Sequence, residues 1–390
     1  MSFITLFKRK TNSKNFIPEI DGLRFFAIIT VLIYHLNTSY VRELGIDMHT
    51  WANELGTKSI YGLGWWIIRL DLGVKVFFSL SGFILALPFI NQYYFSGKKV
   101  IIKDYFYRRI SRLEPPFILS LIILFIAQIV YSRFGFIEMF PHFIAGLFYS
   151  HMIIYGYPNP INNVTWSLET EAQFYIILPL IVLFLVKFRS KKVRTFLFLV
   201  LLTSSIYLRY FTLTEKLNFI GRSILVYFIN FGTGIIFAFF YMYKTSFLKI
   251  SRHLLYDFLF LISLFGLFWF YKPQSYWLNN VLFNLSVFFL FLSVFKGTIS
   301  NLLFTRKIIY LIGGMCYSIY LLHYALLFIL VKYTSKISLG LNYWVDLVIQ
   351  FLILFPIVIF ISAIFYLIIE KPCMDKNWFS KMKKKYNKLS

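Results

Sequence analysis

The chain has 390 residues, of which 59% are hydrophobic and only 14% are charged, whereas a soluble domain averages about 25% charged residues. This composition excludes an ordinary soluble domain and predicts an all-α polytopic membrane protein. The formal net charge of +24 does not indicate a nucleic-acid partner, because the basic residues fall in short clusters between apolar runs. The two cysteines, Cys316 and Cys373, show no disulfide or metal-ligand spacing, so we expect incidental thiols and no bound metal.

Runs of about 20 apolar residues are long enough to cross a bilayer as helices. By this rule the sequence predicts about ten transmembrane helices, over 18–38, 65–90, 114–131, 166–186, 195–212, 222–243, 254–271, 277–295, 308–331 and 344–369. The first follows a basic N-terminus, but Asp21, Arg24 and the lack of a small-residue cleavage site favour a retained helix over a signal peptide. We therefore divide the chain into a basic N-terminus (1–17), a transmembrane domain (18–370) and a basic tail (371–390).

The distribution of Lys and Arg predicts the orientation. If the N-terminus is cytoplasmic, the segments on that side hold 28 of the 40 Lys and Arg residues. Cytoplasmic loops of membrane proteins carry such an excess. Both termini are therefore predicted to lie in the cytoplasm.

The first predicted helix contains two ionisable residues, Arg24 and His35, in the stretch D-G-L-R-F-F-A-I-I-T-V-L-I-Y-H. Eleven residues at about 100° each bring the two side chains within about 20° of one helix face, about 16 Å apart along the axis. The pair is predicted to line one wall of a transmembrane cavity, because ionisable groups inside a membrane usually mark function. A snorkelling arginine and a satisfied interfacial histidine are the alternative.

Two further segments carry candidate residues. Residues 73–83 read G-V-K-V-F-F-S-L-S-G-F; Ser81 would face the cavity or serve helix packing, and Lys75 would hold an anion or reach the headgroups. Residues 103–116, predicted as a cytoplasmic loop, contain three arginines at helical spacing. These are Arg108, Arg109 and Arg112. Guanidinium groups bind phosphate bidentately, although an ordinary positive-inside anchor would look the same.

Two outward-facing segments complete the candidate site. Residues 162–175 read N-N-V-T-W-S-L-E-T-E-A-Q-F-Y, where one acid is explained by the helix dipole. Glu169 is predicted to face the same outer cavity as His35, with Glu171 and Trp166 nearby. Residues 313–323 read G-G-M-C-Y-S-I-Y-L-L-H and bring Ser318 and His323 toward similar depth, although a lone histidine on an apolar helix is often structural.

Taken together, these segments resemble the integral-membrane acyltransferase family 3, which includes O-antigen and peptidoglycan O-acetylases. The likeness lies in D-G-L-R with the Arg24–His35 spacing, in 73–83, in Arg109 and Arg112, in W-S-L-E-T-E-A-Q-F-Y, and in Y-S-I-Y-L-L-H with the closing S-A-I-F-Y-L-I-I-E-K-P. In that pattern Glu171 holds the usual glutamate position, which makes Glu169 secondary. Lys75 departs from the pattern.

The resemblance implies a membrane O-acyltransferase of the bacterial plasma membrane that uses cytoplasmic acyl-CoA, most simply acetyl-CoA, as a co-substrate and no permanently bound cofactor. The acceptor would be a hydroxyl of a cell-surface or lipid-linked glycan. Arg24, Arg108, Arg109 and Arg112 would hold the donor, while His35, with Glu171 or Glu169, would act on the acceptor. Trp166, Ser81, Ser318 and His323 would line the acceptor cavity. Some relatives carry an extracytoplasmic hydrolase-like domain, so direct transfer or a separate partner protein is expected.

Three other readings stay open from the residues alone. One is a glycan polymerase, which would be expected to carry a larger outer loop than 132–165. A transporter or flippase of a glycan lipid would also have many helices and intramembrane charges, although paired inverted repeats with broken helices are not visible. Within the enzyme class, another acyl group such as succinyl, or a non-glycan acceptor, would leave the same pattern. Measuring coenzyme A binding separates the enzyme from the transporter.

Overall fold

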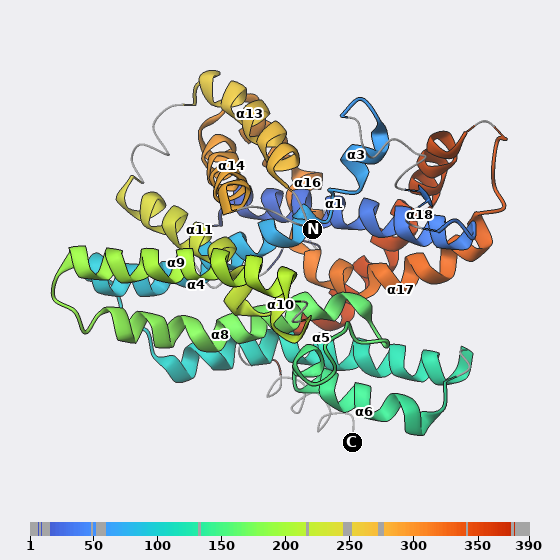
Figure 1. Ribbon diagram of the computed structural model, residues 1–390, viewed down its shortest axis with the longest axis horizontal. Helices are drawn as coiled ribbons and strands as arrows, with labels where there is room; N and C mark the ends of the chain where they lie inside the picture. The colour runs from blue at the N-terminus through green and yellow to red at the C-terminus, as the bar shows by residue number, and fades with distance from the viewer. Residues whose placement is uncertain are drawn as a thin grey trace.

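The structure is a computed structural model that describes residues 7, 9, 16–47, 50–51, 60–131, 134–215, 218–244, 252–271, 277–340, 342–375 and 378. In these ranges the chain forms helices and no strand (Figure 1). Much of the predicted basic N-terminus (1–17) and tail (371–390) lies outside the described residues.

The helices connect in a simple series along the chain. Their bounds are α1 Pro18–Glu43, α3 Leu63–Ile67, α4 Leu72–Tyr94, α5 Ile102–Tyr131, α6 Phe136–Leu147, α7 His151–Tyr155, the 3-10 helix η2 Asn163–Thr165, α8 Trp166–Leu185, α9 Lys191–Thr214, α10 Asn218–Gly221, α11 Ile224–Tyr243, α13 Leu255–Phe270, α14 Trp277–Lys296, α15 Ile299–Phe304, α16 Lys307–Gly314, α17 Cys316–Thr334, α18 Tyr343–Phe365, the π-helix η3 Tyr366–Glu370 and α19 Lys371–Cys373.

Eight helical segments of the described chain are long and apolar enough to cross a membrane. They are Leu63–Tyr94, Ile102–Tyr131, Asn163–Leu185, Lys191–Thr212, Ile224–Tyr243, Trp277–Lys296, Cys316–Thr334 and Tyr343–Cys373. Eight of the ten predicted spans are thereby matched, and the prediction of an all-α multi-pass membrane protein is confirmed. The other two predicted spans are helical as well, but α13 has only 16 residues and α1 is more polar.

The polarity of α1 follows from its place in the bundle. This helix packs against α4, α16 and α17, and in Figure 1 it crosses the middle of the molecule. Its polar side chains Asp21, Thr30 and Asn37 are buried among these neighbours. A helix surrounded by protein does not need the uniformly apolar surface that lipid demands. A hydropathy criterion alone therefore does not select α1 as a membrane span.

Glycines allow a close contact between helices α4 and α11. A Cβ atom added to Gly234 would overlap the backbone carbonyl of Ser79, and one added to Gly82 would overlap that of Phe231. Small residues let two helix backbones approach in this way. The packing fixes α4, which carries both Lys75 and Ser81.

Two local predictions were wrong. Residues 103–116 are not a loop, because α5 runs without interruption from Ile102 to Tyr131 through Pro115 and Pro116. Each proline removes only the hydrogen bond of its own nitrogen, and membrane helices tolerate this where neighbours compensate. The predicted span 308–331 is instead two helices, α16 and α17, which meet at Met315.

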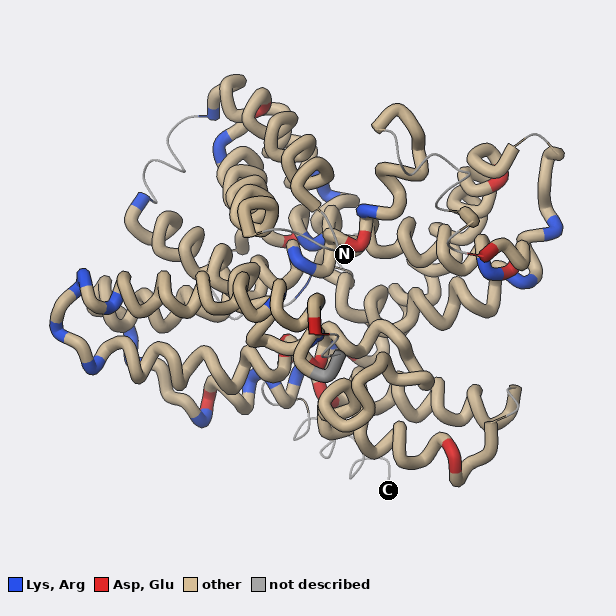
Figure 2. Tube along the Cα trace, viewed as in Figure 1, with Lys and Arg blue, Asp and Glu red and all other residues tan. Residues whose placement is uncertain are grey.

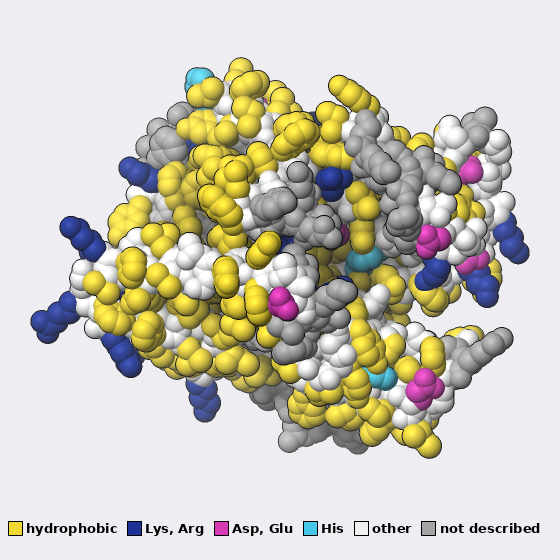
Figure 3. Space-filling model, viewed as in Figure 1, with side chains coloured by type: hydrophobic (Ala, Val, Ile, Leu, Met, Phe, Trp, Pro, Cys, Tyr) yellow, Lys and Arg dark blue, Asp and Glu magenta, His cyan; other side chains and the backbone are white. Residues whose placement is uncertain are grey.

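The surface agrees with a membrane setting. Figure 3 shows hydrophobic side chains over most of the bundle in this view, with a central recess where charged and histidine side chains are visible. Figure 2 shows basic residues at the turn between α8 and α9. Apolar flanks with basic ends are typical of helices that cross a bilayer.

Candidate active site

Three neighbouring cavities run through the bundle and share lining residues. The basic cavity measures about 530 Å³, the middle cavity about 110 Å³ and the histidine cavity about 360 Å³. Arg24, Arg109 and Arg112 line both the basic and the middle cavity. Val31 and Tyr320 line both the middle and the histidine cavity. The three spaces therefore follow one another along α1.

The basic cavity concentrates positive charge. Among the described residues, seven cationic side chains line it, against the single carboxylate of Asp104; they are Arg9, Arg24, Lys98, Lys99, Arg108, Arg109 and Arg112. Burial and the neighbouring Arg24 lower the pKa of Arg9 to about 9, so Arg9 is still cationic at neutral pH. All four arginines predicted to hold a donor thus border one space, and its chemistry suits a multiply phosphorylated ligand.

Two buried carboxylates position the arginines of this cavity. Asp21 Oδ1 accepts a hydrogen bond from Arg24 Nη1 at 2.5 Å and lies 3.7 Å from Arg9 Nη2. Glu370 Oε1, at the end of the π-helix, lies 3.7 Å from Arg112 Nη2. A carboxylate that pairs with an arginine fixes the direction of its guanidinium fork. Asp21 and Glu370 therefore orient the side chains of Arg24 and Arg112.

Ser318 belongs to this support and not to an acceptor cavity. Its backbone N–H and its hydroxyl both donate to Glu370 Oε2, at 3.1 and 2.6 Å, and it lines none of the three cavities. The prediction that Ser318 lines the acceptor cavity was wrong, because its side chain points from α17 toward Glu370 of η3. A buried carboxylate needs such donors.

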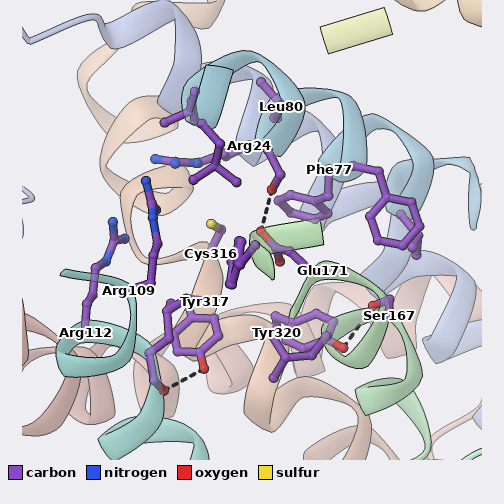
Figure 4. A pocket seen from close by; sticks show the side chains of 18 of the residues that line it. Arg24, Phe77, Leu80, Arg109, Arg112, Ser167, Glu171, Cys316, Tyr317 and Tyr320 are labelled. Carbon is purple, nitrogen blue, oxygen red and sulfur yellow. Dashed lines mark hydrogen bonds between the residues drawn. The ribbon is translucent and has the colours of Figure 1, made fainter. Parts of the chain in front are cut away.

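The middle cavity joins the two larger ones (Figure 4). Glu171 Oε1 accepts a hydrogen bond from the Ser81 hydroxyl, and Glu171 also interacts with Tyr175. The figure shows Arg24, Arg109 and Arg112 on one side of the space and Glu171 and Tyr320 on the other. Glu171 and Ser81, both predicted site residues, thus meet in this passage.

His35 lines the histidine cavity and pairs with His323. His35 Nδ1 lies 2.9 Å from His323 Nε2, and His323 Nδ1 lies 2.8 Å from the carbonyl oxygen of Tyr320 and 3.1 Å from that of Ile319. Carbonyl oxygens only accept, so His323 Nδ1 carries its proton and Nε2 accepts. In the neutral pair His35 Nδ1 is then the donor, which leaves His35 Nε2 with a free lone pair.

This geometry revises the prediction for His323. The side chain is fully buried behind His35 and is absent from the lining of the histidine cavity. It can fix the tautomer and the orientation of His35, as a hydrogen-bonded partner does for many functional histidines. Trp166, by contrast, does line the cavity, as predicted.

Glu169 does not face the outer cavity of His35, so that prediction was wrong. Its Oε2 accepts a hydrogen bond from the backbone N–H of Met152 at 2.9 Å, and Glu169 lines none of the three cavities. Its first-turn position on α8 directs it toward α7. Two residues further on, Glu171 lies on a different face of α8 and reaches the middle cavity.

Tyr320 and two residues that sequence reasoning missed, Arg222 and Asp71, also line these cavities. Tyr320 stands at the junction of two cavities, with its hydroxyl 3.0 Å from Ser167 Oγ and hydrogen-bonded to the Val164 carbonyl. Arg222 and Asp71 line the histidine cavity beside Lys75. Arg222 and Asp71 each lie near the end of an apolar run, where a polar residue is expected anyway, so no signal marked them.

An apolar helical bundle that encloses a charged passage with a histidine pair defines a multi-pass membrane protein with an internal reaction or transport site. Comparison with known families shows to which class of membrane protein the chain belongs. Residues 17–367 match the acyltransferase domain family, and the chain belongs to it. No solved structure gives a significant match.

Several curated proteins are similar to this chain. O-acetyltransferase OatA of Staphylococcus aureus is 26% identical over 360 residues, which cover 82% of this chain and 52% of that protein. Peptidoglycan O-acetyltransferase OatA of Listeria monocytogenes is 29% identical over 46% of this chain and 26% of its own length. The putative peptidoglycan O-acetyltransferase YrhL of Bacillus subtilis is 31% identical over 44% and 24%. In the match with the Staphylococcus aureus protein the chain thus spans about half the length of that relative.

Proposed function

We propose that this chain is a membrane O-acyltransferase that moves an acyl group, most simply acetyl, from cytoplasmic acyl-CoA to a hydroxyl of a cell-surface or lipid-linked glycan. The observation that carries the proposal is the series of cavities, with seven cations at one end and His35 at the other. The names of the relatives support O-acetyl transfer.

The basic cavity would hold the phosphates of coenzyme A. Arginine forks bind phosphate oxygens bidentately, and Arg109 and Arg112 reach both the basic and the middle cavity. The pantetheine arm would then extend through the middle cavity toward His35, over the roughly 16 Å that separates Arg24 and His35 on one helix. Acyl-CoA itself is too highly charged to cross the apolar bundle.

At the far end His35 would act as a general base. Its Nε2 lone pair would take the proton from the acceptor hydroxyl while that oxygen attacks the thioester carbonyl. The new C–O ester bond forms as the C–S bond breaks, and the departing thiolate of coenzyme A takes a proton to become the thiol. His323 would hold His35 in the required tautomer.

The membrane would be the bacterial plasma membrane, with both termini in the cytoplasm, as the distribution of basic residues favours. Lipids would then surround the apolar flanks. As the alternative to direct transfer by His35, we propose a separate extracytoplasmic transferase as a partner that would complete transfer. Adding an extracytoplasmic extract to purified chain would reveal such a requirement.

The decisive experiment uses the full chain in proteoliposomes with acetyl-labelled acetyl-CoA on one side and a glycan acceptor on the other. Label should pass to the glycan, and His35→Ala should lower the rate about 10²- to 10⁴-fold, the usual contribution of a general base. His253→Ala, at an exposed histidine remote from the cavities, is the matched control. Wild-type rates in His35→Ala would refute the base; failure to bind coenzyme A would refute the donor and favour a glycan-lipid transporter.

A further inference from the structure

Besides the proposed base His35, the histidine cavity contains side chains that can recognise an acceptor. Its wall is strongly aromatic, with Tyr34, Trp166, Tyr227, Tyr271, Tyr320 and Tyr324 contributing rings. Such rings combine an apolar face with a polar edge. Residues of this kind suit a ligand that is partly apolar and rich in hydroxyl groups.

Three cations stand against the aromatic rings of this wall. Lys75 Nζ lies 4.1 Å from the ring centroid of Tyr271. The guanidinium carbon of Arg222 lies 5.1 Å from the Trp166 ring, and that of Arg209 lies 5.4 Å from the Tyr227 ring. Cation–π contacts at these distances stabilise a charge but do not neutralise it.

The carboxylates near these cations are too few to balance them. Asp71 is the single carboxylate that lines the histidine cavity among the described residues, and it is hydrogen-bonded to Tyr271. In the described part of the chain, no carboxylate oxygen lies within 4.0 Å of Lys75, Arg209 or Arg222, since the ion pairs there involve other residues.

Burying this excess positive charge inside the protein costs free energy. Lys75 is only 6% exposed and Arg209 only 8%, and buried charge without a counterion is strongly unfavourable. Asp71 Oδ1 is also buried and has no hydrogen-bond partner. The cavity therefore offers buried cations for an anion and an orphaned acceptor for a hydroxyl donor.

We propose that the histidine cavity selects acceptor glycans that carry an anionic group, a carboxylate or a phosphate, and binds that group through Lys75 and Arg222. Asp71 would accept a hydrogen bond from a sugar hydroxyl. The inference rests on the proposed function, because the same cavity contains His35. Lys75 and Arg222 line the space directly, whereas Arg209 adds charge from behind Tyr227.

The test compares three acceptors of equal length with the full chain in nanodiscs and labelled acetyl-CoA: a neutral oligosaccharide, one bearing a uronic-acid carboxylate and one bearing a phosphate. The wild-type protein should use an acidic acceptor at least about tenfold better in kcat/KM, a difference of about 1.4 kcal/mol. Lys75→Met and Arg222→Gln should each lower kcat/KM for that acceptor about tenfold and lower it less for the neutral one, so that the ratio of the two values falls. Lys75→Arg should keep the preference.

Lys332→Met is the matched control, because Lys332 is an exposed residue in the last turn of α17 and lines none of the three cavities. If Lys75→Met does not fold, the half-buried Arg222 carries the test through Arg222→Gln. The carboxylate and phosphate arms decide which anion is preferred.

Equal use of neutral and acidic acceptors by the wild-type protein would overturn the inference and leave the proposed function intact. An acidic preference that survives both Lys75→Met and Arg222→Gln would overturn the assignment to these residues. Direct binding of the acidic oligosaccharides, measured by calorimetry, separates the two hypotheses. Binding that depends on Lys75 without any acetyl transfer would support the inference and refute the proposed function.

Discussion

The hydrogen bond between the two histidines allows a quantitative test of the proposed chemistry. His323→Phe keeps a ring of similar size but removes the acceptor that His35 Nδ1–H contacts at 2.9 Å. Leaving a buried donor unsatisfied costs about 1–3 kcal/mol. The ring of His35 would escape this cost by changing tautomer or by rotating, and either change removes the Nε2 lone pair from the acceptor.

If the full cost appears in the transition state, kcat falls by about 5- to 150-fold, because about 1.4 kcal/mol corresponds to a factor of ten. The KM for acetyl-CoA should not change, since the basic cavity is lined by other residues. His323→Gln retains an oxygen acceptor near the position of Nε2 and should recover much of the rate. Steady-state transfer of labelled acetyl in proteoliposomes gives both constants.

Thermal stability must be measured beside the kinetics, because His323 is completely buried. A wild-type kcat in a folded His323→Phe protein would refute the tautomer argument. Equal losses in His323→Phe and His323→Gln would assign the effect to packing and not to the hydrogen bond. His253→Phe, at an exposed site that lines none of the three cavities, should match the wild-type protein in kcat and KM.

Three further predictions follow from other parts of the structure. Cys316 lines the middle cavity, so in a Cys373→Ser protein coenzyme A should slow its modification by a thiol reagent; unchanged labelling would contradict the proposed donor path. Gly234→Ala should destabilise the α4–α11 contact by about 1–3 kcal/mol and lower Tm, whereas Gly135→Ala, which meets open space, should not. Asp257→Ala should cost about 0.5–2 kcal/mol, because Asp257 caps α15 through three backbone N–H groups.

The Asp257 cap also predicts a pH dependence. Burial raises the pKa of Asp257, but hydrogen bonds from Ser300, Ile299 and Thr298 lower it further than burial raises it. The folded pKa is therefore below the unfolded value of about 3.9. The cap stabilises the protein fully above that value and is lost as pH falls through the folded pKa. The difference in Tm between the wild-type protein and Asp257→Ala should accordingly shrink in acid and remain constant near neutrality.

The local periodicity of the sequence was enough to predict much of the architecture. Apolar runs identified eight helices that can cross a membrane, and the helical repeat placed Arg24 and His35 on one face. The structure has both residues lining consecutive cavities along α1. Such predictions succeed because helix period and span length are properties of a single segment.

Predictions that depended on which neighbour a face meets were less reliable. Glu169 and Glu171 are two residues apart on one helix, and the sequence offered no physical reason to choose between them for the outer cavity. Packing sends the first to the backbone of Met152 and the second to Ser81. Ser318 similarly meets Glu370, 52 residues further along the chain. Such partners are set by tertiary contacts that no local pattern encodes.

The same limit hid two of the three cations at the histidine cavity, Arg209 on α9 and Arg222 before α11, whereas Lys75 on α4 was named from the sequence as a possible anion ligand. The number of cations in each cavity predicts how strongly a single substitution there affects ligand binding. Seven cations share the basic cavity, so losing one would leave most of its field in place. Among the residues that the structure describes, the histidine cavity has only Lys75 and Arg222 as lining cations. Single substitutions should therefore alter acceptor choice more sharply than donor affinity.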